Sequence, residues 1–120
     1  MNKLLFLSLL LISAGAVPHP ASAAGYDGNW SVLIITEKGD CDTAYRYSVG
    51  VANGQIRYTG DAAVTLSGTV TPAGAVKVSV RLGDDGANGT GRLSATAGAG
   101  RWQGFGGGSS CSGRWEAERR

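Results

Sequence analysis

Histidine and methionine are almost absent from this sequence, occurring once each, as His19 and Met1. The chain after residue 23 therefore cannot build a Ser-His-Asp or Cys-His arrangement, and it contains no S-x-x-K motif. Its paired acids fall in expected loops, where acids are ordinary turn residues rather than carboxylates held across a cleft: Asp40 with Asp42, and Asp84 with Asp85. These absences predict a protein that is not an enzyme and that holds no metal or cofactor.

Long hydrophobic runs are scarce as well, and the one present covers Leu4 to Ile12, interrupted only by Ser8. Lys3 precedes this run and small residues follow it at 21–23, which is the order of a secretory signal peptide. The run is about half of the ~20 residues that a membrane span needs, so an N-terminal anchor is disfavoured. We expect a signal peptide over residues 1–23, cleaved near Ala23, and a periplasmic or secreted protein without a membrane span in the remaining chain.

Charge is sparse and nearly balanced. Removing Lys3 leaves ten basic and nine acidic residues, and the basic ones are spread along the chain. Nucleic-acid binding requires basic residues clustered on one face, so no nucleic-acid partner is expected. Residues 24–120 are enough for a single domain.

Only two cysteines are present, Cys41 and Cys111. An even pair in an exported protein forms a disulfide by default, and neither a histidine partner nor a C-x-x-C motif indicates a metal site. The bond would close a loop of seventy residues. In the chain-entropy model such a closure is worth about 4 kcal/mol.

The chain after residue 23 is rich instead in glycine and in short alternating runs. Val, Ile, Tyr and Trp alternate with polar residues between turn residues, and no stretch has a useful helical periodicity, which together indicate an all-β domain. Asn53-Gly54 is a strong hairpin signal. The runs number eight: 29–38, 44–52, 55–59, 63–71, 75–82, 87–95, 100–105 and 112–119.

Eight antiparallel strands predict a small up-and-down barrel, because closing the sheet removes its exposed edges. In such a barrel the first strand pairs with the last, which runs in the opposite direction. Cys41 follows the first run and Cys111 precedes the last, so one disulfide would join the two strands where the barrel closes. A β-sandwich with a cross-sheet disulfide is the alternative.

The connections differ between the two ends of this barrel. One end carries short turns at 53–54, 72–74 and 97–99, and the other carries longer connections at 39–43, 60–62, 83–86 and 106–110. Longer loops usually frame the mouth of a barrel that encloses a ligand. Any mouth is therefore expected at the second end.

Three segments share the form G-R-(L/W)-x-(A/G), at 91–95, 100–104 and 113–117. Neighbouring residues in a strand face opposite ways, so each segment places its arginine outside and its Leu or Trp inside. The small residues two places away share the inward phase. They are expected to make room for tryptophan in a tightly curved sheet.

Four aromatic residues share the inward phase near the end with longer connections: Tyr45, Tyr47, Tyr58 and Trp115. Their apolar rings and polar tips suit the mouth of a small-ligand site. Small eight-stranded barrels are often filled by their own side chains, which favours the interpretation that these aromatics fill the core. The ligand-binding interpretation stays open.

The first run breaks the alternation. If Trp30 and Ile34 face inward, Leu33 and Ile35 face outward. A small outer apolar spot of this kind can serve as a contact for a partner or a second copy, although two exposed aliphatic residues are also ordinary.

Gly28-Asn29-Trp30, at the start of the first run, resembles the G-x-W motif that opens lipocalin-like and avidin-like barrels. In lipocalins an arginine on the last strand packs over that tryptophan, and Arg119 stands at the matching place. The resemblance implies that Trp30 and Arg119 form a structural plug at the short-turn end, stabilised by about 1 kcal/mol of cation–π energy. They are not expected to form a binding site.

From Tyr26 through Trp115 the chain is also similar to a group of small exported bacterial proteins of unknown function. Some of these carry loose labels such as haem-utilisation or adhesion exoprotein. Haem iron usually takes His, Met, Cys or Tyr, and only the tyrosines remain as candidates here. The haem label is therefore not carried over to this chain.

Together these features predict an exported, non-enzymatic small β-barrel that binds a small ligand or an envelope protein. One alternative is an inhibitor of an envelope or host hydrolase, and another is a structural or adhesive envelope protein. A protected cavity near Tyr45, Tyr47 and Trp115 would favour the ligand. A filled barrel with an ordered protruding terminus or loop would favour the inhibitor, and association through Leu33 and Ile35 would favour the structural role.

Overall fold

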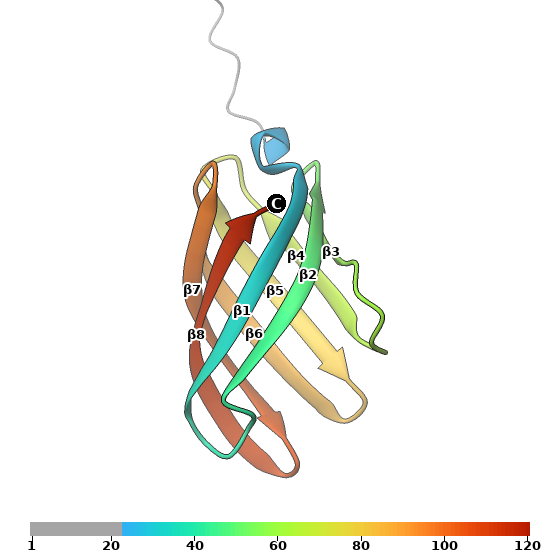
Figure 1. Cartoon of the computed structure of the whole chain (residues 1–120), viewed down its shortest axis with the longest axis vertical. Helices are drawn as coiled ribbons and strands as arrows, with labels where there is room; N and C mark the ends of the chain where they lie inside the picture. The colour runs from blue at the N-terminus through green and yellow to red at the C-terminus, as the bar shows by residue number, and fades with distance from the viewer. Residues whose placement is uncertain (1–22) are drawn as a thin grey trace, which may run out of the picture.

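A computed structural model of the protein describes residues 23–120. The predicted signal peptide, apart from Ala23, lies outside the described residues. A short 3₁₀ turn, η1 (Ala23–Tyr26), precedes eight strands (Figure 1). Their bounds are β1 Gly28–Lys38, β2 Ala44–Ala52, β3 Gln55–Tyr58, β4 Thr65–Val70, β5 Ala75–Leu82, β6 Asp85–Leu93, β7 Ala97–Gly106 and β8 Ser109–Arg119.

The eight strands form one closed barrel, in which each strand pairs with its neighbours in sequence and β1 pairs with β8. Every pair is antiparallel, so the predicted up-and-down barrel is confirmed and the sandwich alternative is wrong. The predicted disulfide is also present, with 6.1 Å between the Cα atoms of Cys41 and Cys111. It joins the β1–β2 loop to β8 where the barrel closes.

Several strand ends differ from the expectation because tight turns replace loops. Residues 83–86 and 106–110 were expected to be longer connections, but strand pairing continues to Leu82 opposite Asp85 and to Gly106 opposite Ser109. Gly83, at a φ of 62°, and the glycines at 107 and 108 adopt the left-handed backbone that such turns require. For the same reason Cys111 lies within β8 rather than before it.

Two further differences concern β7 and the β3–β4 region. The expected turn at 97–99 lies inside β7, and the turn is made instead by 94–96, where the Ser94 hydroxyl accepts a hydrogen bond from the Ala97 N–H at 3.2 Å. The strands β3 and β4 are the shortest, with four and six residues. The barrel wall is therefore short at that side, beside the connection 59–64 (Figure 1).

The hydrophobic core is concentrated in the half of the barrel next to η1. Trp30 is 2% exposed there, and it lies among other buried residues, namely Val49, Val51, Ile56, Val70, Val76, Leu93 and Ala117. Inward-facing residues further from η1, such as Val32, Ile34 and Leu66, are only half-buried. Trp102, Cys111 and Trp115 are buried as well, so packing is looser mainly on the β1, β4 and β5 side of the end away from η1.

The two tryptophan-containing repeats pair with each other across β7 and β8. Gly100 lies opposite Trp115, Trp102 lies opposite Gly113, and Arg101 lies opposite Arg114 between them. Each tryptophan thus faces the glycine of the other repeat. Each ring N–H then reaches a carbonyl beyond the neighbouring strand, Trp102 donating to Ile35 on β1 and Trp115 to Thr90 on β6, both at 3.1 Å.

The indole of Trp115 rests on glycine backbone from β6 and β7. A Cβ atom built at Gly100 would lie 2.5 Å from the Trp115 ring nitrogen, and one at Gly98 would lie 3.4 Å from its ring edge. Gly91 is also in close contact with this ring. The expectation that small residues make room for tryptophan is confirmed at these positions.

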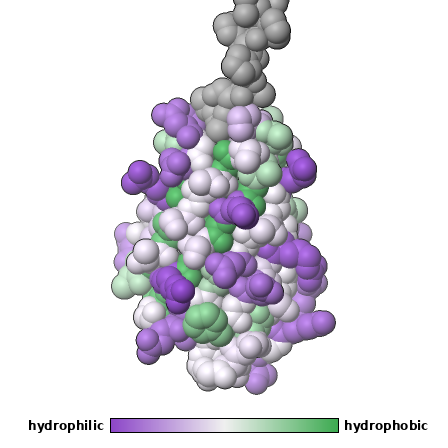
Figure 2. All heavy atoms as spheres, turned by 180° about the vertical axis from the view of Figure 1, so that it is seen from behind, coloured by the Kyte–Doolittle hydropathy of each residue, from purple (hydrophilic) through white to green (hydrophobic). Residues whose placement is uncertain are grey.

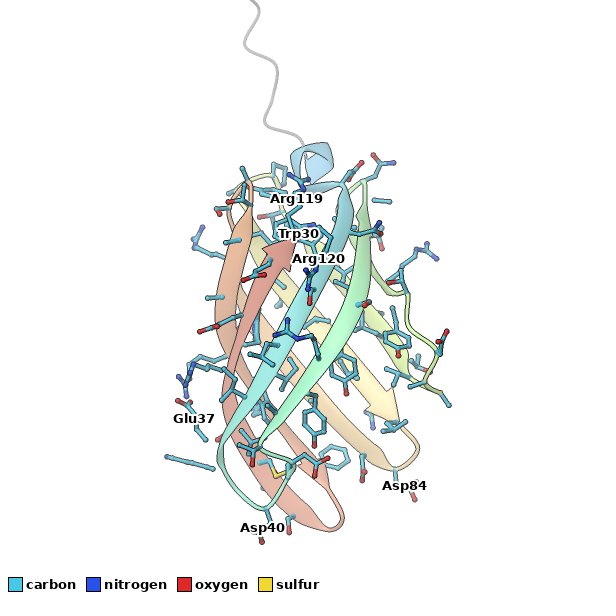
Figure 3. The ribbon with its side chains drawn as sticks, in the orientation of Figure 1. Trp30, Glu37, Asp40, Asp84, Arg119 and Arg120 are labelled. Carbon is cyan, nitrogen blue, oxygen red and sulfur yellow. A yellow bond between two sulfur atoms is a disulfide. The ribbon has the colours of Figure 1, made fainter. Side chains whose placement is uncertain are left out.

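On the outer face, the facing arginines of the two repeats share one carboxylate. Arg101 and Arg114 lie 2.9 and 3.4 Å from the carboxylate oxygens of Glu37, which is labelled in Figure 3. Glu37 lies at a register shift in β1 between Thr36 and Lys38. It offsets the repulsion of two like charges placed directly opposite each other in a sheet.

Replacing Gly100 by Ala is expected to destabilise the fold by about 1–3 kcal/mol, because the added methyl group overlaps Trp115 and the backbone of β6. The matched control is Gly25→Ala, where an added Cβ meets no described atom within 4 Å. Denaturant unfolding followed by tryptophan fluorescence measures both. Equal midpoints for the two variants would contradict the role given to Gly100.

Replacing Cys41 and Cys111 together by Ser is expected to lower the free energy of unfolding by about 4 kcal/mol, because a loop of seventy residues is released in the unfolded chain. The fold itself is kept, since the β1–β8 ladder continues from Thr36 to Trp30 without the bond. Urea unfolding and far-ultraviolet circular dichroism measure the two effects. Wild-type protein in reducing agent is the control and should match the double variant.

Candidate functional site

An apolar cavity of about 200 Å³ lies inside the barrel, and its lining runs from buried core residues near η1, such as Trp30 and Leu93, to the opposite end. All eight strands contribute to its lining, mostly through Val, Ile, Leu and Trp side chains. Leu82, at the end of β5, belongs to this lining and is still 46% exposed, so the cavity opens to solvent at that end. The favoured expectation of a barrel filled by its own side chains is therefore wrong where this cavity lies.

Small residues form part of the inner wall on β6. Ala87 lines the cavity and pairs with Val80 on the neighbouring strand β5. Gly89 pairs with Val78 and makes room for that side chain, since a Cβ atom built at Gly89 would lie 3.0 Å from it. A barrel of this strand number has just enough interior for side chains, so replacing several of them by glycine or alanine leaves a void.

The polar atoms of the buried aromatic residues are satisfied within the protein. The ring N–H of Trp30 donates to the Tyr26 carbonyl at 2.9 Å, and those of Trp102 and Trp115 bind the carbonyls named above. Throughout residues 23–120, no buried side-chain nitrogen or oxygen lacks a hydrogen-bond partner. The cavity walls are thus mainly apolar, and the buried polar atoms beside them already have hydrogen-bond partners within the protein.

Three tyrosines with neighbouring rings form a ladder at the cavity. The ring centroids of Tyr45 and Tyr47 are 6.3 Å apart, and those of Tyr47 and Tyr58 are 6.1 Å apart in an edge-to-face arrangement. Tyr45, Tyr47 and Trp115 line the cavity, as the ligand interpretation required, whereas Tyr58 is not part of the lining and contacts it through Tyr47. Three of the four aromatic candidates are thus brought together at one site.

The hydroxyl of Tyr47 is partly withdrawn from water. Burial raises the pKa of Tyr47 above its usual value of 10, and the neighbouring Tyr45 and Tyr58 raise this pKa further. Burial has this effect because it disfavours the charged phenolate. Tyr47, which lines the cavity, therefore carries a neutral hydroxyl at ordinary pH.

Acidic residues gather at the open end. The loops and turns there carry Asp40, Asp42, Asp84 and Asp85, and Figure 3 places Asp40 and Asp84 at the end opposite η1. The Asp85 carboxylate accepts a hydrogen bond from the Gly107 N–H at 3.3 Å, which ties two mouth turns together. The described chain contains no cluster of three or more His, Cys, Asp or Glu residues that could hold a metal ion.

The opposite end is closed by Trp30 and Arg119. The guanidinium carbon of Arg119 lies 5.2 Å from the centre of the Trp30 ring (Figure 3). Its nitrogens donate to the carbonyls of Ala95 at 2.7 Å, Gly25 at 3.0 Å and Asp27 at 2.6 Å. Trp30 also lines the cavity, so the same ring forms the floor of the candidate site, which differs from the expected purely structural plug.

The proposed partner spot on β1 is less open than expected. Leu33 and Ile35 are half-buried, and Leu33 lies between Arg46 and Glu116 in the sheet register. Sequence reasoning missed Leu82 and Phe105, which are the exposed large hydrophobic residues of the described chain. Both residues belong to the cavity lining, and the guanidinium carbon of Arg81 lies 6.0 Å from the centre of the Phe105 ring. In Figure 2 hydrophilic residues are scattered over the rear face without a broad hydrophobic patch.

Comparison with protein-family models, curated proteins and solved structures gives no match. The resemblances to lipocalin-like barrels and to small exported bacterial proteins therefore stay predictions. Within residues 23–120 no helix is both long and apolar enough to span a membrane.

Replacing Arg119 by Gln is expected to destabilise the protein by about 2 kcal/mol, because three charge-assisted hydrogen bonds and the contact with Trp30 are lost. Arg120→Gln removes the same charge from the neighbouring, exposed residue and is the control. Thermal unfolding compares the two. Equal losses would show that net charge, rather than the plug, accounts for the effect.

The raised pKa of Tyr47 makes the stability of the fold sensitive to alkaline pH. The folded state holds the Tyr47 proton more tightly than the unfolded state, so this contribution is fully present below pH 10 and is lost as pH rises through the folded-state pKa. The free energy of unfolding of Tyr47→Phe is therefore expected to fall less steeply than that of wild type above pH 10. Urea unfolding at several pH values between 9 and 11 measures the slopes, and identical slopes would contradict this linkage.

Proposed function

We propose that the protein is an exported, non-enzymatic β-barrel that binds a small, mainly apolar ligand inside its cavity. The observation that carries this proposal is the void of about 200 Å³, which is lined by apolar side chains and open at one end. The predicted signal peptide and the Cys41–Cys111 disulfide support export, because disulfides persist in oxidising compartments.

The energetic reason for a ligand is the apolar surface left in contact with water. Val32, Ile34, Leu66 and Val78 face the interior but are only partly buried, and Leu82 is 46% exposed. Covering apolar surface stabilises a complex by about 25 cal/mol per Å². A barrel that served only as a rigid framework would gain stability from a larger side chain at Ala87, which lines the cavity.

The size of the cavity sets the size of the ligand. A dry apolar cavity of about 150 Å³ holds one benzene molecule in another, engineered protein. The cavity here, at about 200 Å³, matches one aromatic ring with a small substituent or a short acyl chain. A larger ligand would have to extend through the mouth beside Leu82.

The two other predicted roles have weaker support. An inhibitor acting through a protruding segment gains nothing from an open apolar interior. A structural or adhesive role through Leu33 and Ile35 is disfavoured because these side chains are half-buried, and Arg46 and Glu116 flank Leu33.

Blocking the cavity tests the proposal. Toluene and p-cresol, titrated into ¹⁵N-labelled wild-type protein, are expected to shift the indole N–H resonances of the three lining tryptophans, Trp30, Trp102 and Trp115. Ala87→Phe places a ring in the cavity and is expected to weaken binding at least tenfold, because the ring occupies the ligand volume.

The matched control is Ala99→Phe, which puts the same ring on the exposed outer face of β7 and should bind as wild type does. Native mass spectrometry of protein recovered without denaturation should also detect a discrete small adduct. Absence of probe binding to the folded wild type, up to the solubility limits of both probes, would overturn the proposed function.

A further inference from the structure

The ladder tyrosines differ in what their hydroxyl groups contact. The Tyr45 hydroxyl accepts a hydrogen bond from the Asp42 N–H at 3.2 Å, and the Tyr58 hydroxyl accepts one from the Ala62 N–H at 3.1 Å. Both outer rings are thereby tied to the loops beside them. Among residues 23–120 the Tyr47 hydroxyl, between them, makes no hydrogen bond, so its donor and acceptor capacity are both free.

Tyr47 also occupies the level of the barrel where a ligand would lie. It pairs with Val32 on β1, one inward position nearer the mouth than Trp30 and Val49. All four of these side chains line the cavity. A molecule resting on the Trp30 floor therefore extends past Tyr47 before it reaches the mouth.

The surrounding walls make this hydroxyl distinctive. The three tryptophan N–H groups that line the cavity are already bound to the backbone carbonyls of Tyr26, Ile35 and Thr90. The other lining side chains of β1 and β5 are aliphatic. The remaining polar side chains of the lining are Tyr45, whose hydroxyl already accepts a hydrogen bond from the Asp42 N–H, and Asp85 and Asn88 on β6. On the β1, β2 and β5 walls, a ligand polar group that does not reach Tyr47 would face aliphatic side chains and stay unpaired, which is costly.

We propose that Tyr47 determines the specificity of the site by hydrogen bonding to the single polar group of an otherwise apolar ligand, and that this group is not anionic. The inference rests on the proposed function and adds the chemical class of the ligand. Phenols, alcohols, ketones and amines of about one ring in size fit this description, whereas pure hydrocarbons and carboxylates do not.

The charge at the mouth supports the exclusion of anions. Four aspartates occupy the loops and turns of the open end, and Asp85 is itself part of the cavity lining. The basic residues nearest to them in sequence are Lys38 and Arg81. A carboxylate held in an apolar site beside these acids would have neither solvent nor a partner charge to stabilise it.

Three probes that share one tolyl framework test the inference. Toluene has no polar group, p-cresol has a neutral hydroxyl, and p-toluate has a carboxylate. Dissociation constants from the tryptophan N–H shifts give the ratio of toluene to p-cresol affinity for each variant. Tyr47→Phe is expected to shift that ratio about tenfold in favour of toluene, because the variant loses one hydrogen bond to p-cresol and none to toluene.

Tyr58→Phe is the matched control, because it removes the same hydroxyl from a ladder residue that does not line the cavity. Its probe ratio is expected to equal that of wild type. Wild type is expected to bind p-toluate at least tenfold more weakly than p-cresol at pH 7. An unchanged ratio in Tyr47→Phe, or p-toluate binding as tightly as p-cresol, would overturn the inference while leaving the proposed function intact.

A measurement on wild type alone keeps the test valid if Tyr47→Phe does not fold. Nuclear Overhauser contacts with bound p-cresol are expected between its ring protons next to the hydroxyl and the Tyr47 ring, and between its methyl group and Trp30. The reverse orientation would overturn the inference. Failure of all three probes to bind would instead overturn the proposed function on which it rests.

Discussion

The reciprocal contact between glycine and tryptophan on β7 and β8 is the constraint on which the rest of the barrel depends. Trp115 lies on the bare backbone of Gly100, and Trp102 lies opposite Gly113. Each indole crosses one strand and donates to a carbonyl of the next, which links β6, β7, β8 and β1. These four strands enclose the site of closure, and the disulfide to Cys111 reinforces the same region.

The same use of small residues divides the interior into two unequal halves. Near η1 the aliphatic side chains and Trp30 are buried, and Arg119 covers the ring from outside. Further along, the inward side chains are only half-buried, and Ala87 lines the cavity without filling it. A narrow barrel can thus combine a well-buried end with a cavity, because the closed hydrogen-bond ladder maintains the wall where packing does not.

Much of the candidate site could be predicted from alternation alone. The inward phase of β2 identified Tyr45 and Tyr47, and both line the cavity. The filling of the interior could not be predicted, because it depends on how the volumes of residues from eight strands add up across the barrel. Tyr58 was expected in the lining because it shares the inward phase. It lies outside the lining, because β3 ends at this residue and its ring packs edge-to-face against Tyr47.

The sequence by itself determined the all-β class, the eight strands and the place of the disulfide, because period-two alternation and turn residues act over a few neighbouring positions. It also determined that each arginine of the G-R-W repeats points away from its tryptophan. Only the tertiary structure decided that the turns at Gly83 and Gly107 are tight, that Glu37 joins Arg101 to Arg114, and that a cavity remains. These features depend on register and on volumes summed across strands, which no local pattern records.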